Sequence, residues 1–150
     1  VIAGVGLVTS LGRTAETTWK AVCEGLCGVG AATALESVLS PDPGAGQVAD
    51  DDSDAAASQS REVRYLRSAI EQALNEAGLN SGSATSRVGM VIGTTLHGMR
   101  HGGIFLRSGD FESLRGFLAG ATLAEIAKTS PTLSFSATTC SGTGTDAPGQ

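Results

Sequence analysis

One run of residues, Thr132 to Gly142, most constrains what this chain can fold into. It is an apolar, β-prone stretch that stops at a single cysteine, Cys140, after which small residues and glycine follow. That order predicts a strand ending in a tight turn, with a thiol held at the rim of a sheet where it could act as a nucleophile. The alternative is a small cysteine buried at a strand end, because free cysteine is among the most buried residue types.

The residues after Cys140 bear on whether its thiol is activated. At the start of a helix, unpaired backbone N–H groups and the positive dipole end favour the thiolate. Here Ser141 leads into two glycines, and Pro148 and Gly149 follow soon after. Glycine and proline break a helix quickly, so the dipole contribution expected at Cys140 is small.

Helix and strand patterns alternate in the amino-terminal half. A short first strand and a glycine-rich turn open the chain, and Thr14 is the predicted N-cap of the helix that follows. We expect Gly28 to lie just past the end of that helix. A second helix is predicted from Arg64 to Gly78. The apolar faces of the two helices are formed by Trp19, Val22, Cys23 and Leu26, and by Leu66, Ile70, Ala73, Leu74 and Ala77.

The same alternation continues toward the carboxyl end. Val88 to Ile92 is short, apolar and β-branched, which predicts a buried strand. Thr122 with Glu125 predicts a capping box for a helix that ends near Lys128, before Pro131. Strands separated by helices predict an α/β fold with a parallel or mixed sheet covered by helices.

Length and charge limit the possible classes of protein. The 150 residues fit one domain, residues 1–150, with an exposed and mobile acidic loop at about 40–60. Fifteen acidic against ten basic residues give a net charge of −5, which argues against a nucleic-acid partner. No apolar run approaches the ~20 residues of a membrane span, and no leader peptide is recognised. Three cysteines form no disulfide framework, so a cytoplasmic location is expected.

Two other groups of residues resemble ligand-binding motifs but do not have the required spacing. Gly4 and Gly6 match the first two glycines of a dinucleotide-binding fingerprint, but Thr9 stands where the third is required and Gly12 comes too late. Tight turns are therefore the better explanation for these glycines. Cys23 and Cys27 lie too far in sequence from His97 and His101 for a zinc finger. Core packing of Cys23 is the interpretation that its apolar helix face favours.

The amino-terminal stretch Val1 to Gly12, followed by Trp19 and by Gly25 to Val29, resembles the start of β-ketoacyl synthases. Those enzymes begin with a Val/Thr-Gly-x-Gly-x-Val-Thr-Pro-x-Gly pattern and a helix that carries a tryptophan. The likeness continues, in the family's order, through the predicted helix Arg64 to Gly78, the stretch Arg87 to Thr95 and the turn at Cys140.

The resemblance implies a thiolase-like α/β fold, of which this chain would be the amino-terminal half. The complete family fold stacks two similar halves into five layers, usually as a homodimer. Alone, the chain would therefore be incomplete and prone to associate with itself.

The resemblance also implies an acyltransferase chemistry in fatty-acid or polyketide biosynthesis. Cys140 would take an acyl group from acyl carrier protein as a thioester, and its backbone N–H would be one oxyanion-hole donor. Malonyl carrier protein would then lose CO₂, and its carbanion would attack that thioester in a decarboxylative Claisen condensation. Thr139 and Ser141 flank the cysteine and receive no chemical role. Neither a cofactor nor a metal is implied.

His97 and His101 are not assigned a catalytic role. They lie in a stretch, Thr95 to Gly103, that is predicted to be a flexible loop after a strand. In the family the two active-site histidines and a lysine come after the nucleophile. We therefore expect that the 150 residues alone do not catalyse condensation.

Two alternatives from other classes stay open. One is a non-catalytic, synthase-like partner subunit that docks on an active one, against which Cys140 argues because such partners lack the cysteine. The other is a binding module for carrier protein or acyl chains. Neither the pathway nor the acyl chain length follows from the sequence.

Overall fold

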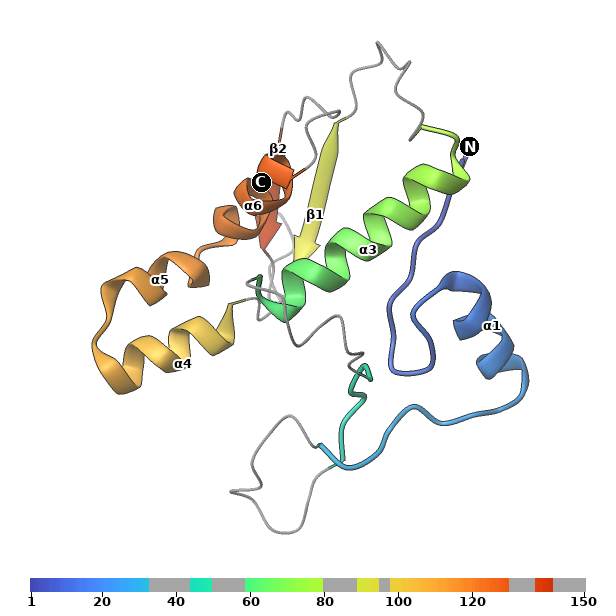
Figure 1. The fold of residues 1–150 in the computed structure, drawn as a ribbon, viewed down its shortest axis with the longest axis horizontal. Coiled ribbons are helices and arrows are strands. Elements are labelled where there is room, and N and C mark those ends of the chain that lie inside the picture. The colour runs from blue at the N-terminus through green and yellow to red at the C-terminus, as the bar shows by residue number, and fades with distance from the viewer. Residues whose placement is uncertain (33–43, 50–58, 80–88, 95–97, 130–136, 142–150) are drawn as a thin grey trace, which may run out of the picture. The chain divides into compact units, whose positions relative to one another are not determined.

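The computed structural model describes residues 1–32, 44–49, 59–79, 89–94, 98–129 and 137–141. They belong to two compact units, Val1–Ser81 and Gly82–Gln150, each of which is described by itself. Figure 1 shows their elements. The first unit contains the helices α1 (Ala15–Cys23) and α3 (Arg61–Glu76). The second contains β1 (Met90–Thr94), α4 (Met99–Ser108), α5 (Phe111–Phe117), α6 (Ala119–Thr129) and β2 (Ala137–Ser141).

Helix α1 begins at the residue predicted to cap it. The Oγ1 of Thr14 accepts a hydrogen bond from the N–H of Thr17 (3.1 Å), and the Oγ1 of Thr17 accepts one from the N–H of Thr14 (3.1 Å). This reciprocal capping box satisfies two donors at the helix start. The predicted end was wrong, because Gly25 and not Gly28 takes the left-handed conformation (φ 71°) just after the C-cap.

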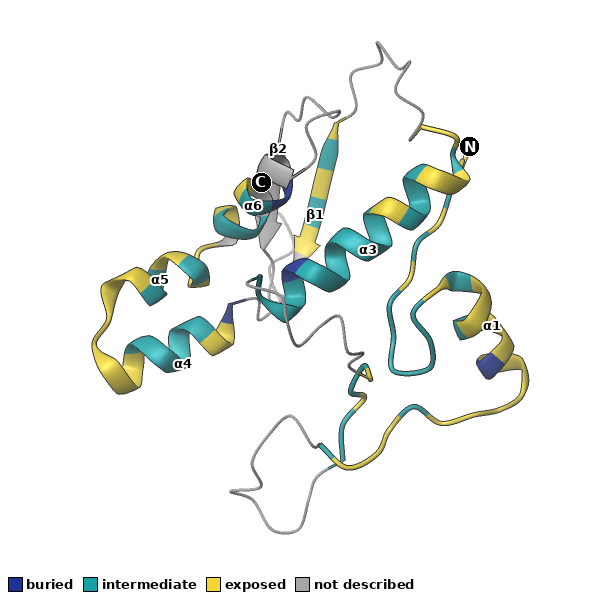
Figure 2. Ribbon diagram, viewed as in Figure 1, coloured by how far each residue is buried: buried dark blue, intermediate teal, exposed yellow. Residues whose placement is uncertain are grey.

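The apolar face of α1 is exposed, as Figure 2 shows in yellow. Trp19 is 69% exposed, and Val22 and Cys23 are exposed with it. The core position predicted for Cys23 was therefore wrong. The reason is that the buried residue of this helix is the small Ala21, so α1 makes its close contacts away from the predicted stripe.

Helix α3 confirms the second predicted helix and begins three residues earlier, at Arg61. Gly78 follows its C-cap with φ 71°, as predicted. The amino-terminal segment, residues 1–8, lies along this helix and forms no strand among the described residues, so the short first strand was wrong. Two side chains of α3 accept hydrogen bonds from backbone N–H groups of the amino-terminal segment. These bonds take the place of pairing with another strand.

The acidic loop predicted at 40–60 lies largely outside the described residues. Within it, Ala45 exchanges two backbone hydrogen bonds with Gly30 (3.0 and 2.8 Å). The carbonyl of Ala49 accepts a hydrogen bond from Nη1 of Arg13 (3.2 Å). This part of the predicted loop is therefore tied to other residues of the first unit, and whether the loop is mobile stays a prediction.

In the second unit, β1 and β2 pair in parallel, as the alternation of elements predicted. Strand β1 extends two residues beyond the predicted Ile92, to Thr94, and its predicted first residue, Val88, lies outside the described residues. Helix α6 lies against β2, and its Ile126 is only 1% exposed. Helices α4, α5 and α6, which lie between the two strands in the sequence, belong to the crossover that a parallel pair requires.

Two predictions for this crossover were wrong. Thr122 lies inside α6 and does not cap it, because the helix already begins at Ala119, directly after the extended residue Leu118. His101 lies in α4 and not in a flexible loop. Pro131 and His97 lie outside the described residues.

Helices α4 and α5 form a hairpin whose packing depends on glycine. The ring of His101 lies against Gly116, and a methyl group added to Gly102 would contact the ring of Phe117 at 3.1 Å. The rings of Phe105 and Phe111 also meet, with centroids 5.3 Å apart. These tertiary contacts explain why a sequence with two adjacent glycines is helical here, against its local propensity.

Candidate active site

The parallel ladder fixes the backbone position of Cys140. Its register pairs Ile92 with Thr139, Gly93 with Cys140, and Thr94 with Ser141. Cys140 is thus the fourth of the five residues of β2, near the carboxyl end of the strand. Because β1 and β2 are parallel, their carboxyl ends meet at one edge, which is where open α/β sheets bind ligands.

The strand does not stop at the cysteine as predicted. It continues to Ser141, because that residue still pairs with Thr94. Residues 132–136 and 142–150 lie outside the described residues, so the turn predicted after Cys140 stays a prediction. The described backbone places Cys140 on the last part of a strand.

Exposure alternates along β1 with the period of a strand. Val91 is 78% exposed and Gly93 is exposed, whereas Met90 and Ile92 are half-buried. Successive residues of a strand belong to opposite faces of the sheet, so Val91 and Gly93 share the open face. Strand β1 was predicted to be buried, and on this face that prediction was wrong.

Register neighbours in a parallel ladder share a face, which assigns Cys140 to the same face as Gly93. A Cβ built on Gly93 would meet no atom of the described residues within 4 Å. The face that carries position 140 is therefore open on its β1 side, within the part of the chain that the structure describes. An open strand position at a carboxyl edge suits a residue that must meet a substrate.

The ladder itself supplies no charge to this position. Among the ten residues of β1 and β2, Cys140 is the one with an ionisable side chain. A thiolate there would need stabilisation from dipoles and backbone N–H groups, and not from an ion pair within the ladder.

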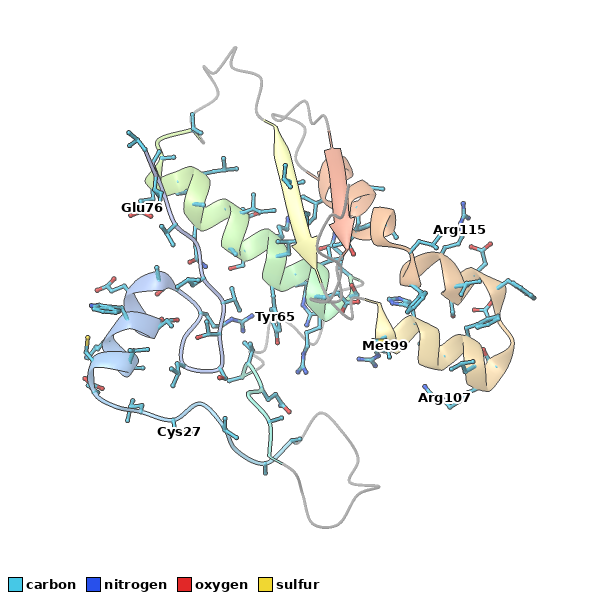
Figure 3. The ribbon with its side chains drawn as sticks, turned by 180° about the vertical axis from the view of Figure 1, so that it is seen from behind. Cys27, Tyr65, Glu76, Met99, Arg107 and Arg115 are labelled. Carbon is cyan, nitrogen blue, oxygen red and sulfur yellow. The ribbon has the colours of Figure 1, made fainter. Side chains whose placement is uncertain are left out.

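The other candidate residues are distributed as follows. His101 packs against Gly116 in the α4–α5 hairpin. Cys23 and Cys27 are free and exposed in the first unit, and Figure 3 labels Cys27 on the segment after α1. Across the described ranges, no group of three or more His, Cys, Asp or Glu side chains could hold a metal ion. Nor does any helix in those ranges combine the length and apolar character needed to cross a membrane.

Sequence reasoning missed Gly93. The signal was present, because a glycine inside an otherwise apolar strand often marks a place where a ligand or another backbone approaches closely. Its pairing with Cys140 could not be read from the sequence, since 46 residues, with α4, α5 and α6 among them, separate the two positions. The register of the ladder provides that link.

Comparison with known proteins identifies the relatives of this chain. The family described as "Beta-ketoacyl synthase, N-terminal domain" matches residues 1–128. No curated protein matches. The matched region ends before β2, so the position of Cys140 rests on the ladder register.

A solved structure, "The ishigamide ketosynthase/chain length factor", is similar with a TM-score of 0.71 and 23% sequence identity. The match covers 94% of this chain and 39% of that one. At that identity the likeness shows the fold, and it confirms the α/β, thiolase-like architecture expected for part of the complete family fold. The chain spans well under half the length of the structure it matches.

Proposed function

This chain belongs to the β-ketoacyl synthase family, and on that premise we propose that Cys140 accepts an acyl group in fatty-acid or polyketide biosynthesis. The observation that carries the proposal is the pairing of Cys140 with Gly93 at the carboxyl edge of the ladder, on a face that is open along β1. The family supplies the reaction class, and the register supports the choice of residue.

The proposed first step is a thioester exchange. The thiolate of Cys140 attacks the carbonyl carbon of an acyl group carried as a thioester by acyl carrier protein. A new carbon–sulfur bond forms as the bond to the carrier sulfur breaks. The carrier thiolate that leaves takes up the proton that Cys140 lost. One thioester replaces another, so the step needs positioning more than a driving force.

A reducing compartment such as the cytoplasm is part of the proposal, because the step requires Cys140 as a free thiol. Acyl carrier protein is the proposed partner, as donor of both the acyl and the malonyl groups. A second copy of the chain or a synthase-like subunit is the proposed assembly partner.

The second step, condensation, is proposed for the protein in which these residues join the remaining part of the family fold. Malonyl carrier protein loses CO₂, and the resulting carbanion attacks the carbonyl carbon of the Cys140 thioester. A carbon–carbon bond forms as the carbon–sulfur bond to Cys140 breaks, and Cys140 leaves as the thiolate that began the first step. The chain matches 39% of the length of its solved relative, so we propose that the 150 residues alone accept the acyl group without condensing it.

Acyl transfer is tested by incubating the purified chain with hexanoyl-acyl carrier protein and measuring its intact mass. We expect one acyl group, which neutral hydroxylamine removes because it is held as a thioester. Cys140→Ala should abolish the mass increase, whereas the matched Cys27→Ala, which removes an exposed free thiol of the first unit, should keep it. Acylation of the Cys140→Ala variant to the wild-type extent would refute the proposal. An unmodified wild-type chain would favour the non-catalytic subunit or the binding module.

Condensation is tested separately by adding malonyl carrier protein to the acylated chain. We expect the acyl group to stay on the protein, with no β-ketoacyl product. Turnover by the 150-residue chain would show that the remaining part of the family fold is dispensable for the second step.

A further inference from the structure

We infer that Gly93 sets the size of acyl group that Cys140 accepts, because a side chain at this register neighbour of the cysteine would enter a space that no described atom fills. The inference rests on the proposed function, since it concerns what the acyl-accepting residue can take. Gly93 touches no reacting atom through a side chain, so its role would be to provide room.

The first step of the argument is the register. Gly93 and Cys140 are paired residues of a parallel ladder, and neighbouring strands lie about 4.8 Å apart. Paired positions of a ladder share a face, so position 93 is the register neighbour of position 140 on β1. An acyl group held at position 140 on that face would therefore have position 93 as its neighbour on β1.

The second step is the space at Gly93. A Cβ there would meet no atom of the described residues within 4 Å, and φ at this residue is not in the left-handed region. Glycine is thus required neither by backbone conformation nor by close packing among those residues. A β-branched residue would suit a strand better, so glycine here has a cost that an acyl neighbour would explain.

The third step is the exposure of the same face two residues earlier. Val91 is 78% exposed and shares the face with Gly93. The alkyl part of an acyl group that passes Gly93 would meet this apolar side chain next. Burying apolar surface there would favour longer chains over acetyl by the hydrophobic effect.

The experiment compares Gly93→Ala and Gly93→Val with the wild-type chain. A matched control is Gly89→Val, because Gly89 is also exposed, also has no described atom near its Cβ, and precedes the ladder. Positions 89 and 93 are four residues apart, about 13 Å along an extended chain, which is beyond the reach of a hexanoyl group bound at 140.

Each variant is treated with two alkylating reagents, iodoacetamide and N-hexyl iodoacetamide, and the rates at Cys140 are measured by peptide mass spectrometry. Acetyl and hexanoyl thioesters of N-acetylcysteamine are tested in parallel. The labelling rate of the exposed Cys27 is the internal reference for the intrinsic reactivity of each reagent.

The measured quantity is the rate of labelling of Cys140 by N-hexyl iodoacetamide divided by its rate of labelling by iodoacetamide. We expect Gly93→Val to lower this ratio by about tenfold or more, and Gly93→Ala to lower it less. The control should leave the ratio within about twofold of the wild type. An unchanged ratio in Gly93→Val, or an equal loss of both rates, would overturn the inference. Because alkylation needs no acyl donor, this outcome is independent of the thioester experiment, whose failure would instead count against the proposed function.

Discussion

The backbone N–H of Val5 donates a hydrogen bond to Oε2 of Glu76 at 2.6 Å, across 71 positions of the chain. A second bond, from the N–H of Leu7 to Oε1 of Gln72 (3.3 Å), repeats the arrangement one turn earlier on α3. Figure 3 labels Glu76 beside the amino-terminal segment. Two side chains of one helix thus bind the backbone of an extended segment at two places.

Glu76→Ala should therefore destabilise the first unit by about 1 kcal/mol, the usual net contribution of a hydrogen bond. Glu76→Gln keeps an acceptor oxygen and should lose less. Urea unfolding followed by circular dichroism measures both. Equal stability of the alanine variant and the wild type would mean that the bond does not hold the segment.

Gly6→Ala tests the close approach between the segment and α3. The added methyl group would overlap the backbone of α3 at Ala69, so the segment would have to move away. We expect a loss of about 1–3 kcal/mol in the free energy of unfolding. Gly30→Ala is the control, since no described atom lies within 4 Å of its Cβ, and it should change stability by less than about 0.5 kcal/mol. Equal losses in the two variants would contradict the predicted clash.

Gly116→Ala tests the α4–α5 hairpin in the same way. A Cβ at this position would lie 2.6 Å from Cγ of the His101 ring, which would have to leave its place. Thermal unfolding should show a loss of about 1–3 kcal/mol. Gly120→Ala, in a helix with no described atom near the new methyl group, should instead be neutral or stabilising by up to about 1 kcal/mol. A neutral Gly116→Ala would show that the glycine is not needed.

Asp110 gives a pH-dependent prediction at the start of α5. Ser113 Oγ donates a hydrogen bond to its Oδ2 (2.8 Å) and the N–H of Glu112 donates one to its Oδ1 (3.1 Å). These bonds, that from Ser113 foremost, lower the pKa of Asp110 below its ordinary 3.8. A lowered folded pKa means that the stabilisation is present above the unfolded pKa and is lost as the pH falls through the folded value.

Ser113→Ala should therefore raise the pKa of Asp110 toward 3.8, as followed by carboxyl chemical shifts between about pH 2 and 5. Ser108→Ala is the comparison, because Ser108 Oγ accepts from the backbone N–H of Asp110 and does not donate to its carboxylate. It should leave the titration nearly unchanged. A pKa of Asp110 that does not respond to Ser113→Ala would contradict the assigned cause.

Local signals predicted some elements and not others. Thr14 and Gly78 were placed correctly because capping depends on residues next to the helix end. The α4–α5 hairpin was missed because two glycines in α4 argue against a helix, and only packing against α5 reverses that preference. The exposure of Trp19 could not be predicted either, because helical periodicity identifies an apolar face without saying what covers it.

Of the candidate site, the sequence predicted the strand that carries Cys140 but not the residue that pairs with it. The residue types around Cys140 indicated a strand and a nucleophile, and the strand is present although it runs one residue further. The pairing with Gly93 depends on how two distant strands align, and no local pattern specifies that register. Whether Cys140 is the nucleophile stays a prediction.

The most direct test of that prediction is a competition among the three cysteines of one wild-type molecule. The chain is exposed to a limiting amount of hexanoyl-acyl carrier protein, and the acyl group is located on peptides that contain Cys23, Cys27 or Cys140. We predict that nearly all of the thioester is on Cys140, although the other two thiols are free and exposed. Acyl groups spread evenly over the three cysteines, or found mainly on Cys23 and Cys27, would contradict it.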